Sequence, residues 1–177
     1  MKLYLDFETR SRCDLKKAGA YRYAEDPSTE ILCMAYAVDD EPVQILTQDS
    51  FTDEWNGFFK LAAKADAFFS HNAGFERALW REKLPAPLPP LDRWRCSAAQ
   101  AAACCLPRDL AGACEAIGTD SKKDVTARSL MLKLSKPHKS GQFVGTPEEF
   151  QRLYQYCIQD VIAERALSQA LPPLSEG

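Results

Sequence analysis

The first strand of the chain carries two acidic residues on one face, and this feature limits the possible fold more than any other. Residues 2–6, Lys-Leu-Tyr-Leu-Asp, are rich in apolar and aromatic side chains, as a core strand is. Asp6 and Glu8 close this predicted strand, and residues two apart in a strand share a face. Burying both carboxylates costs desolvation and mutual repulsion, which a bound metal cation offsets. The alternative is an exposed strand end with two solvated acids.

Composition limits the class of protein further. A chain of 177 residues, 46% hydrophobic and 27% charged, fits one globular domain with a real core. The net charge of −3 argues against a broad basic surface for non-specific duplex binding. It leaves room for a small site that holds a few phosphates through metal.

Seven cysteines are present, with no Cys-x-x-Cys pair, and most lie in apolar runs. They are interpreted as buried free thiols in a reducing compartment. The two histidines, His71 and His138, argue against a structural zinc site. We find no signal-like N-terminus and no apolar run of the roughly 18 residues that span a membrane. A soluble protein without a membrane partner, located in the cytoplasm, is therefore expected.

The pattern of the remaining chain predicts alternating strands and helices. A polar loop is expected at about 9–29, and residues 118–145 are expected to be partly loop. Strands are predicted at 31–39, 43–46, 67–70 and 93–97, and helices at 53–64, 74–83, 98–104, 108–117 and 147–170. Thr146, Pro147 and Glu149 form a strong helix start with a capping box. This order predicts an α/β domain with a mixed sheet.

Two further groups of polar residues accompany these elements. Asn72 and Glu76 lie at a strand-to-helix junction, beside His71. Tyr156 and Asp160 are four apart on the last helix and therefore share one face, beside its apolar stripe. Taken singly, Glu76 is explained by the helix dipole, Asp160 by solvation, and His71 by an ordinary half-buried hydrogen bond. The ordered set Asp-x-Glu, Asn-x-x-Phe-Glu and Tyr-x-x-x-Asp favours one shared site.

This ordered set resembles the DEDD 3′–5′ exonucleases, in the branch with a tyrosine in the third motif. Residues 5–11 (LDFETRS), 19–24 (GAYRYA) and 27–32 (PSTEIL) look more narrowly like the proofreading domain of phage and prophage family A DNA polymerases. Residues 156–161 (YCIQDV) and 171–174 (LPPL) fit the same group. The resemblance covers nearly the whole chain. It implies that 1–177 is a single 3′–5′ exonuclease domain, in which about 171–177 resembles the linker toward a polymerase domain.

The resemblance implies a ribonuclease-H-like fold, with a mixed, mostly five-stranded sheet flanked by helices, and a site for two divalent cations, Mg²⁺ or Mn²⁺. By this resemblance Asp6 bridges the two cations, Glu8 and Asp160 complete the first cation's site, and Glu76 holds the second cation. Many members of the family have aspartate where this chain has Glu76. Tyr156 would orient the attacking water, and its ordinary pKa near 10 makes it a poor base unaided.

The same resemblance suggests where substrate is bound. Asn72 would support the site or contact the terminal nucleotide, and Thr9 in the first motif would also contact substrate. Phe7, Phe75 and the segment 21–23 (Tyr-Arg-Tyr) would stack on bases or wedge between them. For these aromatic residues, packing in the core is an equally good explanation.

The expected function is a metal-dependent 3′–5′ exonuclease that removes nucleotides from single-stranded or frayed DNA 3′ ends, as in proofreading. Its expected partners are single-stranded DNA 3′ ends and a family A polymerase domain in the parent protein, in the cytoplasm of a bacterial or phage-infected cell. An RNA-trimming exonuclease is one alternative. A catalytically weak domain that binds nucleic acid or a polymerase is another, although such a domain usually loses one of the acids or the tyrosine.

Overall fold

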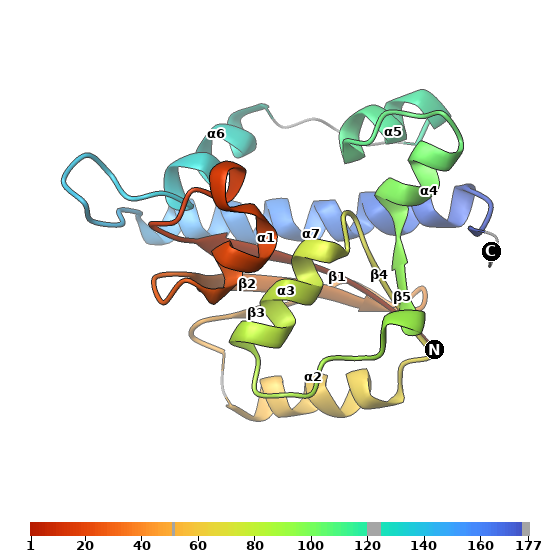
Figure 1. The fold of residues 1–177 in the computed structure, drawn as a ribbon, viewed down its shortest axis with the longest axis horizontal. Coiled ribbons are helices and arrows are strands. Elements are labelled where there is room, and N and C mark those ends of the chain that lie inside the picture. The colour runs from red at the N-terminus through yellow and green to blue at the C-terminus, as the bar shows by residue number, and fades with distance from the viewer. Residues whose placement is uncertain (51, 120–124, 175–177) are drawn as a thin grey trace.

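The computed structural model describes residues 1–50, 52–119 and 125–174, with the backbone alone for 125–128. It shows a sheet with helices on both faces (Figure 1). The sheet has five strands in the order β3-β2-β1-β4-β5. Its strands are β1 (Lys2–Arg10), β2 (Glu30–Val38), β3 (Gln44–Thr47), β4 (Ala67–Ser70) and β5 (Trp94–Cys96). Strand β1 pairs antiparallel with β2 and parallel with β4, so the expected mixed sheet is confirmed.

The helices follow the predicted pattern closely after the second strand. They are α1 (Leu15–Glu25), α2 (Thr52–Lys64), α3 (Gly74–Lys83), α4 (Ser97–Ala103), α5 (Leu110–Ile117), α6 (Val125–Leu134) and α7 (Pro147–Ala170). A 3-10 turn, η1 (Leu91–Arg93), leads into β5. Helix α7 begins with the predicted capping box, in which the Thr146 and Glu149 side chains each bond the other's backbone N–H.

Side chains of β1 alternate between two different environments. Leu3, Leu5 and Phe7 belong to the main core cluster, which also contains Phe58 of α2 and Trp80 of α3. The intervening residues Tyr4, Asp6 and Glu8 therefore point to the other face, the one covered by α7. On that face Tyr4 packs in one cluster with Cys157 and Val161 of α7. The long helix thus lies directly over the acidic side of β1.

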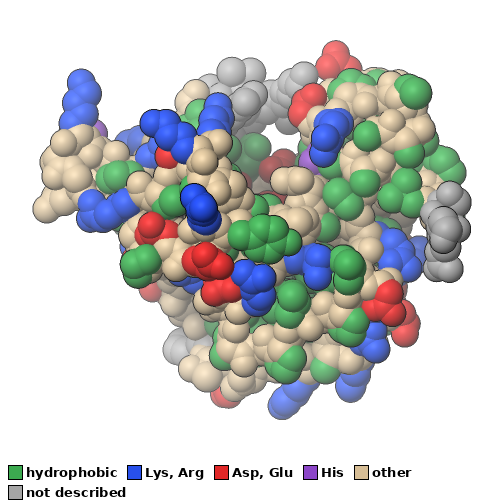
Figure 2. All heavy atoms as spheres, viewed as in Figure 1, with side chains coloured by type: hydrophobic (Ala, Val, Ile, Leu, Met, Phe, Trp, Pro, Cys, Tyr) green, Lys and Arg blue, Asp and Glu red, His purple; other side chains and the backbone are tan. Residues whose placement is uncertain are grey.

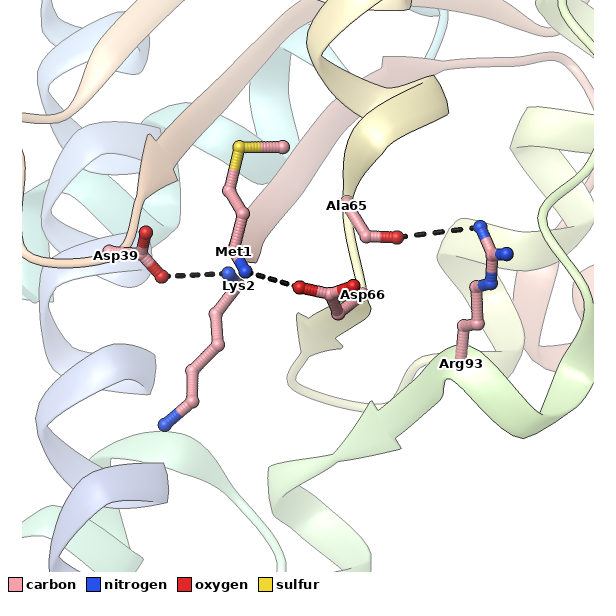
Figure 3. Close-up of polar contacts among 6 residues, drawn as sticks. All are labelled: Met1, Lys2, Asp39, Ala65, Asp66 and Arg93. Atoms are coloured by element: carbon pink, nitrogen blue, oxygen red, sulfur yellow. Dashed lines mark hydrogen bonds and ion pairs between the residues drawn. The ribbon is translucent and has the colours of Figure 1, made fainter.

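Polar contacts at the start of β1 fix the strand between its two neighbours (Figure 3). The Met1 ammonium group bonds the Asp66 carboxylate, immediately before β4. The Lys2 backbone N–H donates to Asp39 Oδ1, just after β2, at 2.7 Å. The Arg93 guanidinium donates to the Ala65 carbonyl and so joins the entry of β4 to the segment before β5. These contacts hold the register that places Asp6 and Glu8.

Two expectations need correction. The first strand continues to Arg10, so Asp6 and Glu8 lie inside it rather than at its end. The expected loop at 9–29 contains helix α1, which Gly19 interrupts with a φ of 77°. Its polar sequence and the interrupting glycine hide the helical pattern. The segment 118–145 is partly loop, as expected, and contains helix α6 at Val125–Leu134, while 120–124 lies outside the described residues.

The cysteines are all free, as expected, but their burial differs. Cys33, Cys114 and Cys157 are buried, Cys13, Cys96 and Cys104 are partly buried, and Cys105 is exposed. Among the described residues, no helix combines the length and apolar character needed to cross a membrane.

Candidate metal-binding active site

Three carboxylates from distant parts of the sequence meet between β1 and α7. Ligand oxygens of Asp6, Glu8 and Asp160 all lie within 4.8 Å of one another. Glu8 is 8% exposed, and Asp6 and Asp160 are partly buried. The structure therefore brings together the first and third predicted motifs, on the face of β1 that α7 covers.

Burial and like charge act together on this acidic cluster. Burial first, and then the neighbouring Asp160 charge, raise the pKa of Asp6 well above its usual range. Burial followed by the charge of Asp6 raises the pKa of Glu8 in the same direction. Burial raises the pKa of Asp160 to about 6, while a hydrogen bond from Tyr156 opposes the shift. Without a cation, the cluster therefore holds protons near neutral pH.

Oxygen ligands in this number suit a hard divalent cation. Carboxylate oxygens are the donors that Mg²⁺ and Mn²⁺ prefer. Repulsion between the carboxylates raises their pKa values. A cation bound among them would attract all three carboxylates and so remove that effect. The ligand oxygens of Asp6, Glu8 and Asp160 are close enough to bind one ion together, and they are poorly solvated. Their chemistry therefore fits such an ion.

Tyr156 lies one helical turn before Asp160 and donates a hydrogen bond to its carboxylate. Burial, followed by the negative charges of Asp160 and Glu8, raises the pKa of Tyr156 far above 10. The phenol is therefore protonated at any physiological pH. Its hydroxyl can orient groups in the site but cannot act as a base.

The buried thiol of Cys157 is hydrogen-bonded to the acidic cluster. The Cys157 Sγ–H donates to Asp6 Oδ2 and to the Asp6 carbonyl, both at 3.5 Å. Cys33 is paired in register with Glu8 and lies in the same buried cluster as Cys157. Small side chains on β2 at this point let α7 approach the sheet, which brings Asp160 close to β1.

Glu76 enters from the first turn of α3 and is 2% exposed. Its Oε2 atom has no hydrogen-bond partner in the described part of the chain. Burial, and then the charge of Asp6, raise the pKa of Glu76 well above its ordinary value. The charges of Glu76 and Asp6 thus interact, but Glu76 is not among the three acids that form the tight group.

The residues before Glu76 form a tight turn. Asn72 has a φ of 70° and is exposed. His71 is partly buried, and its ring nitrogens contact Ser97 Oγ at 3.0 Å and the Arg108 carbonyl at 2.8 Å. His71 is therefore a hydrogen-bonded, half-buried side chain, as preferred from the sequence.

The predicted substrate contacts occupy different environments. Phe7 is 4% exposed within the main core, and Thr9 is 6% exposed with its hydroxyl 2.9 Å from the Tyr23 hydroxyl. Phe75 is partly buried and packs against Tyr23 with ring centroids 5.9 Å apart. Tyr21 is 53% exposed and lies beneath the Arg81 guanidinium. Asn72, Phe75 and Tyr21 thus retain surface that a nucleotide can reach, whereas Phe7 packs in the core.

Glu164, which sequence reasoning missed, is a further buried acid. It lies one helical turn after Asp160 and is 2% exposed. Burial raises its pKa to about 8, and the Asp6 charge adds to the shift. The only sequence signal is its spacing of four from Asp160, which places it on the same helix face.

The face drawn in Figure 2 is hollowed between the α6 and α5 regions, and acidic side chains are visible inside the hollow. Lys and Arg side chains gather on the α1 and α6 side. There the guanidinium groups of Arg10 and Arg12 lie 5.0 and 5.5 Å from the centre of the Phe143 ring. Lys136 and Lys139 are exposed in the adjoining loop. We call Arg10, Arg12, Lys136 and Lys139 the basic rim.

Comparison with known proteins gives two informative results, while no family model matches the chain. A protein of Bacillus phage SP02 described as a DNA polymerase is 36% identical over 179 residues. The match includes 96% of this chain but 28% of the phage protein, so the chain spans little more than a quarter of that relative.

The family B DNA polymerase of the archaeon Pyrobaculum calidifontis has a similar structure, with a TM-score of 0.60 and 16% identity. The similarity includes 96% of this chain and 24% of the archaeal chain. At that identity the likeness concerns the fold. The expected ribonuclease-H-like α/β fold, a mixed five-stranded sheet flanked by helices, is confirmed.

Proposed function

We propose that this chain is a metal-dependent 3′–5′ exonuclease domain that hydrolyses single-stranded or frayed DNA 3′ ends. The observation that carries the proposal is the group of three poorly solvated carboxylates, Asp6, Glu8 and Asp160, within 4.8 Å of one another. Such a group is costly for the fold and is useful when cations neutralise it. The similarity to part of a phage DNA polymerase supports DNA as the substrate class.

Asp6, Glu8 and Asp160 would hold a first divalent cation, and Asp6 together with Glu76 would face a second. Two bound cations supply activation of water and stabilise charge on the attacked phosphate and the leaving oxygen. The chain's own part is to fix these carboxylates rigidly. Asp6 and Glu8 are fixed by β1, and Asp160 is fixed by α7 packed against that strand.

Tyr156 would position the attacking water. Its phenol is held one turn from Asp160 and is protonated, so it offers a hydrogen bond without removing a proton. Neither histidine bonds Asp6, Glu8 or Asp160, because His71 bonds Ser97 Oγ and the Arg108 carbonyl and His138 is exposed in the loop after α6. Proton removal therefore depends on the cations and on pH.

The substrate would reach the acids as an unstacked strand. The basic rim offers cationic side chains for a few phosphates, although Arg10 is also paired with Glu30 at 2.6 Å. The exposed faces of Tyr21 and Asn72 lie on the α1 and α3 side. A protein of net charge −3 has no broad basic surface that would hold a duplex. Proofreading, next to a family A polymerase domain in a longer parent protein, is the role we propose for this activity.

The test is degradation of a single-stranded DNA oligonucleotide labelled at the 5′ or the 3′ end, with Mg²⁺, Mn²⁺ or EDTA. We expect a descending ladder from the 5′ label, immediate release of a labelled mononucleotide from the 3′ label, and no cleavage in EDTA. Asp160→Asn serves as the inactive control. The opposite polarity, or cleavage that persists in EDTA or in Asp160→Asn, would refute the proposal.

Two further arms address the alternatives. An RNA oligonucleotide of the same sequence that is degraded faster than DNA would favour RNA trimming. Binding of either oligonucleotide without any cleavage, at all metal concentrations, would favour a catalytically weak binding domain. The chain keeps three acids, Asp6, Glu8 and Asp160, close enough to bind one ion, and it keeps Tyr156 hydrogen-bonded to Asp160. This argues against a catalytically weak domain.

A further inference from the structure

Glu164 is a buried acid whose two oxygens lack any partner in the described part of the chain. The side chain is 2% exposed, and neither Oε1 nor Oε2 accepts a hydrogen bond. A buried carboxylate is normally paired or hydrogen-bonded, since leaving it unsatisfied destabilises the fold. Something other than protein atoms is therefore expected to satisfy Glu164.

The neighbouring protein groups are already engaged elsewhere. The adjacent Arg165 guanidinium donates to the carbonyls of Asp39 and Glu41 at 3.2 and 2.7 Å. The Ser97 hydroxyl lies near enough to Glu164 to lower its pKa, but it is 3.0 Å from His71 Nδ1 and leaves both Glu164 oxygens without a hydrogen bond of ordinary geometry. Glu164 is thus not explained as half of a structural ion pair.

Unpartnered oxygens gather where the parallel strands β4 and β5 end. Ser70 at the end of β4 pairs in register with Cys96 of β5, and Ser97 follows directly. Glu76 Oε2 and Ser70 Oγ are buried without partners, as are both oxygens of Glu164. The Glu164 charge acts on Glu76, and the Asp6 charge acts on both. Glu76, Glu164 and Asp6 are therefore near enough for their charges to interact, and the unpartnered atoms of Glu76 and Glu164 are oxygens.

We propose that Glu164 is a fifth carboxylate of the active site, which together with Glu76 holds a second divalent cation on the β4–β5 side of Asp6. Oxygen-only donors with two carboxylates suit a hard cation such as Mg²⁺ or Mn²⁺. On α7, Asp160 and Glu164 are one turn apart, and the charge of Asp6 interacts with both. The inference rests on the proposed function, because it assigns the second cation of that same site.

The geometry also explains the longer acid at position 76. Glu76 approaches from α3 and lies outside the tight group around Asp160. Glu164 from α7 supplies a second carboxylate on that side. The second cation therefore depends less on having the shorter aspartate side chain at position 76. Glu76 and Glu164 are then expected to act as a unit.

The test is Mn²⁺ binding, measured by the loss of the free Mn²⁺ signal in electron paramagnetic resonance and by calorimetry. Wild type should bind two ions. Glu164→Gln and Glu76→Gln should each weaken the same one of the two, by about 10- to 100-fold. The double variant should lose little more than either single one. Glu41→Gln, a change at an exposed glutamate, is the matched control, and Asp160→Asn marks the other ion.

Unchanged stoichiometry and affinity in Glu164→Gln, relative to Glu41→Gln, would overturn the inference. A second measurement applies even if the variant does not fold: wild-type crystals soaked in Mn²⁺ should show anomalous density beside Glu164 and Glu76. Density confined to Asp6, Glu8 and Asp160 would also overturn it. The nuclease assay on wild type judges the proposed function separately, because cation binding is measured without substrate.

Discussion

Replacing Glu164 by glutamine is expected to change how the stability of the metal-free protein depends on pH. Burial raises the pKa of Glu164 from 4.5 to about 8, with Asp6 adding to the shift and Ser97 and Arg165 opposing it. An acid whose pKa is higher in the folded state binds protons more tightly there, so its contribution to stability falls as pH rises. The loss begins near pH 4.5, where the unfolded acid ionises, and is complete above about pH 8.

The magnitude follows from the same numbers. One pKa unit corresponds to about 1.36 kcal/mol, and linkage between pH 5 and pH 8 then gives a loss of roughly 3 kcal/mol. Glutamine does not ionise, so this loss should be absent from Glu164→Gln. The difference in unfolding free energy, variant minus wild type, should therefore rise by roughly 3 kcal/mol over that range. Asp6, Glu8 and Glu76 titrate in both proteins, so their own contributions cancel in the difference in unfolding free energy. What remains of them there is their charge interaction with Glu164.

The assay is urea unfolding in EDTA at pH 5, 6, 7 and 8, followed by tryptophan fluorescence. Glu41→Gln controls for the loss of one carboxylate, because its side chain is exposed. Saturating Mg²⁺ should reduce the effect or reverse its sign, since wild type then binds the ion more tightly. A difference that stays flat from pH 5 to pH 8 would show that Glu164 is not ionising inside a desolvated site.

Three further outcomes are expected. Asp6→Ala should abolish nuclease activity yet keep or raise the melting temperature without metal, because one repelling charge is removed; near wild-type trimming would refute its role. Glu76→Asp should stay within about tenfold of wild-type activity, roughly 1.4 kcal/mol of barrier, whereas equal rates for Glu76→Gln and wild type would exclude a metal-site role. Activity should fall in acid, where protons compete with the cations for Asp160, whose pKa burial raises, and should rise through neutrality. A mismatched 3′ end should be cut faster than a paired one; a flat pH profile or a preference for paired ends would contradict this.

The acidic cluster was within reach of sequence reasoning because its signals are local. Alternation along β1 places Asp6 and Glu8 on one face, and the spacing of Tyr156 and Asp160 places them on one side of a helix. The capping box fixes the start of that helix. The spacing of these residues and their acidic character therefore point to the same site. The structure brings Asp6, Glu8 and Asp160 together.

The parts that were missed depend on tertiary contacts. Glu164 stands beside Arg165 in the sequence, as in a solvated charged segment, and it is buried by the packing of α7 in the fold. Helix α1 is interrupted at Gly19 and has a weak apolar pattern, so its existence follows from packing against α3 rather than from its own periodicity. For Phe7, alternation along β1 already assigns the face opposite to Asp6, and the structure places it in the core.

The anchoring of β1 at Lys2 has a consequence for how this protein can vary. After the bonds of Met1 and Lys2, the residues from Leu3 to Glu8 pair one by one with β2, and Lys2 to Tyr4 pair with β4. Inserting or deleting one residue between Lys2 and Asp6 would exchange the two faces and drive both acids into the apolar core. A substitution in this segment changes one side chain and leaves the register of β1 intact. A change of length shifts the register of every residue that follows. We therefore expect libraries of this domain to tolerate point changes at Leu3 and Leu5 far better than any single-codon indel there.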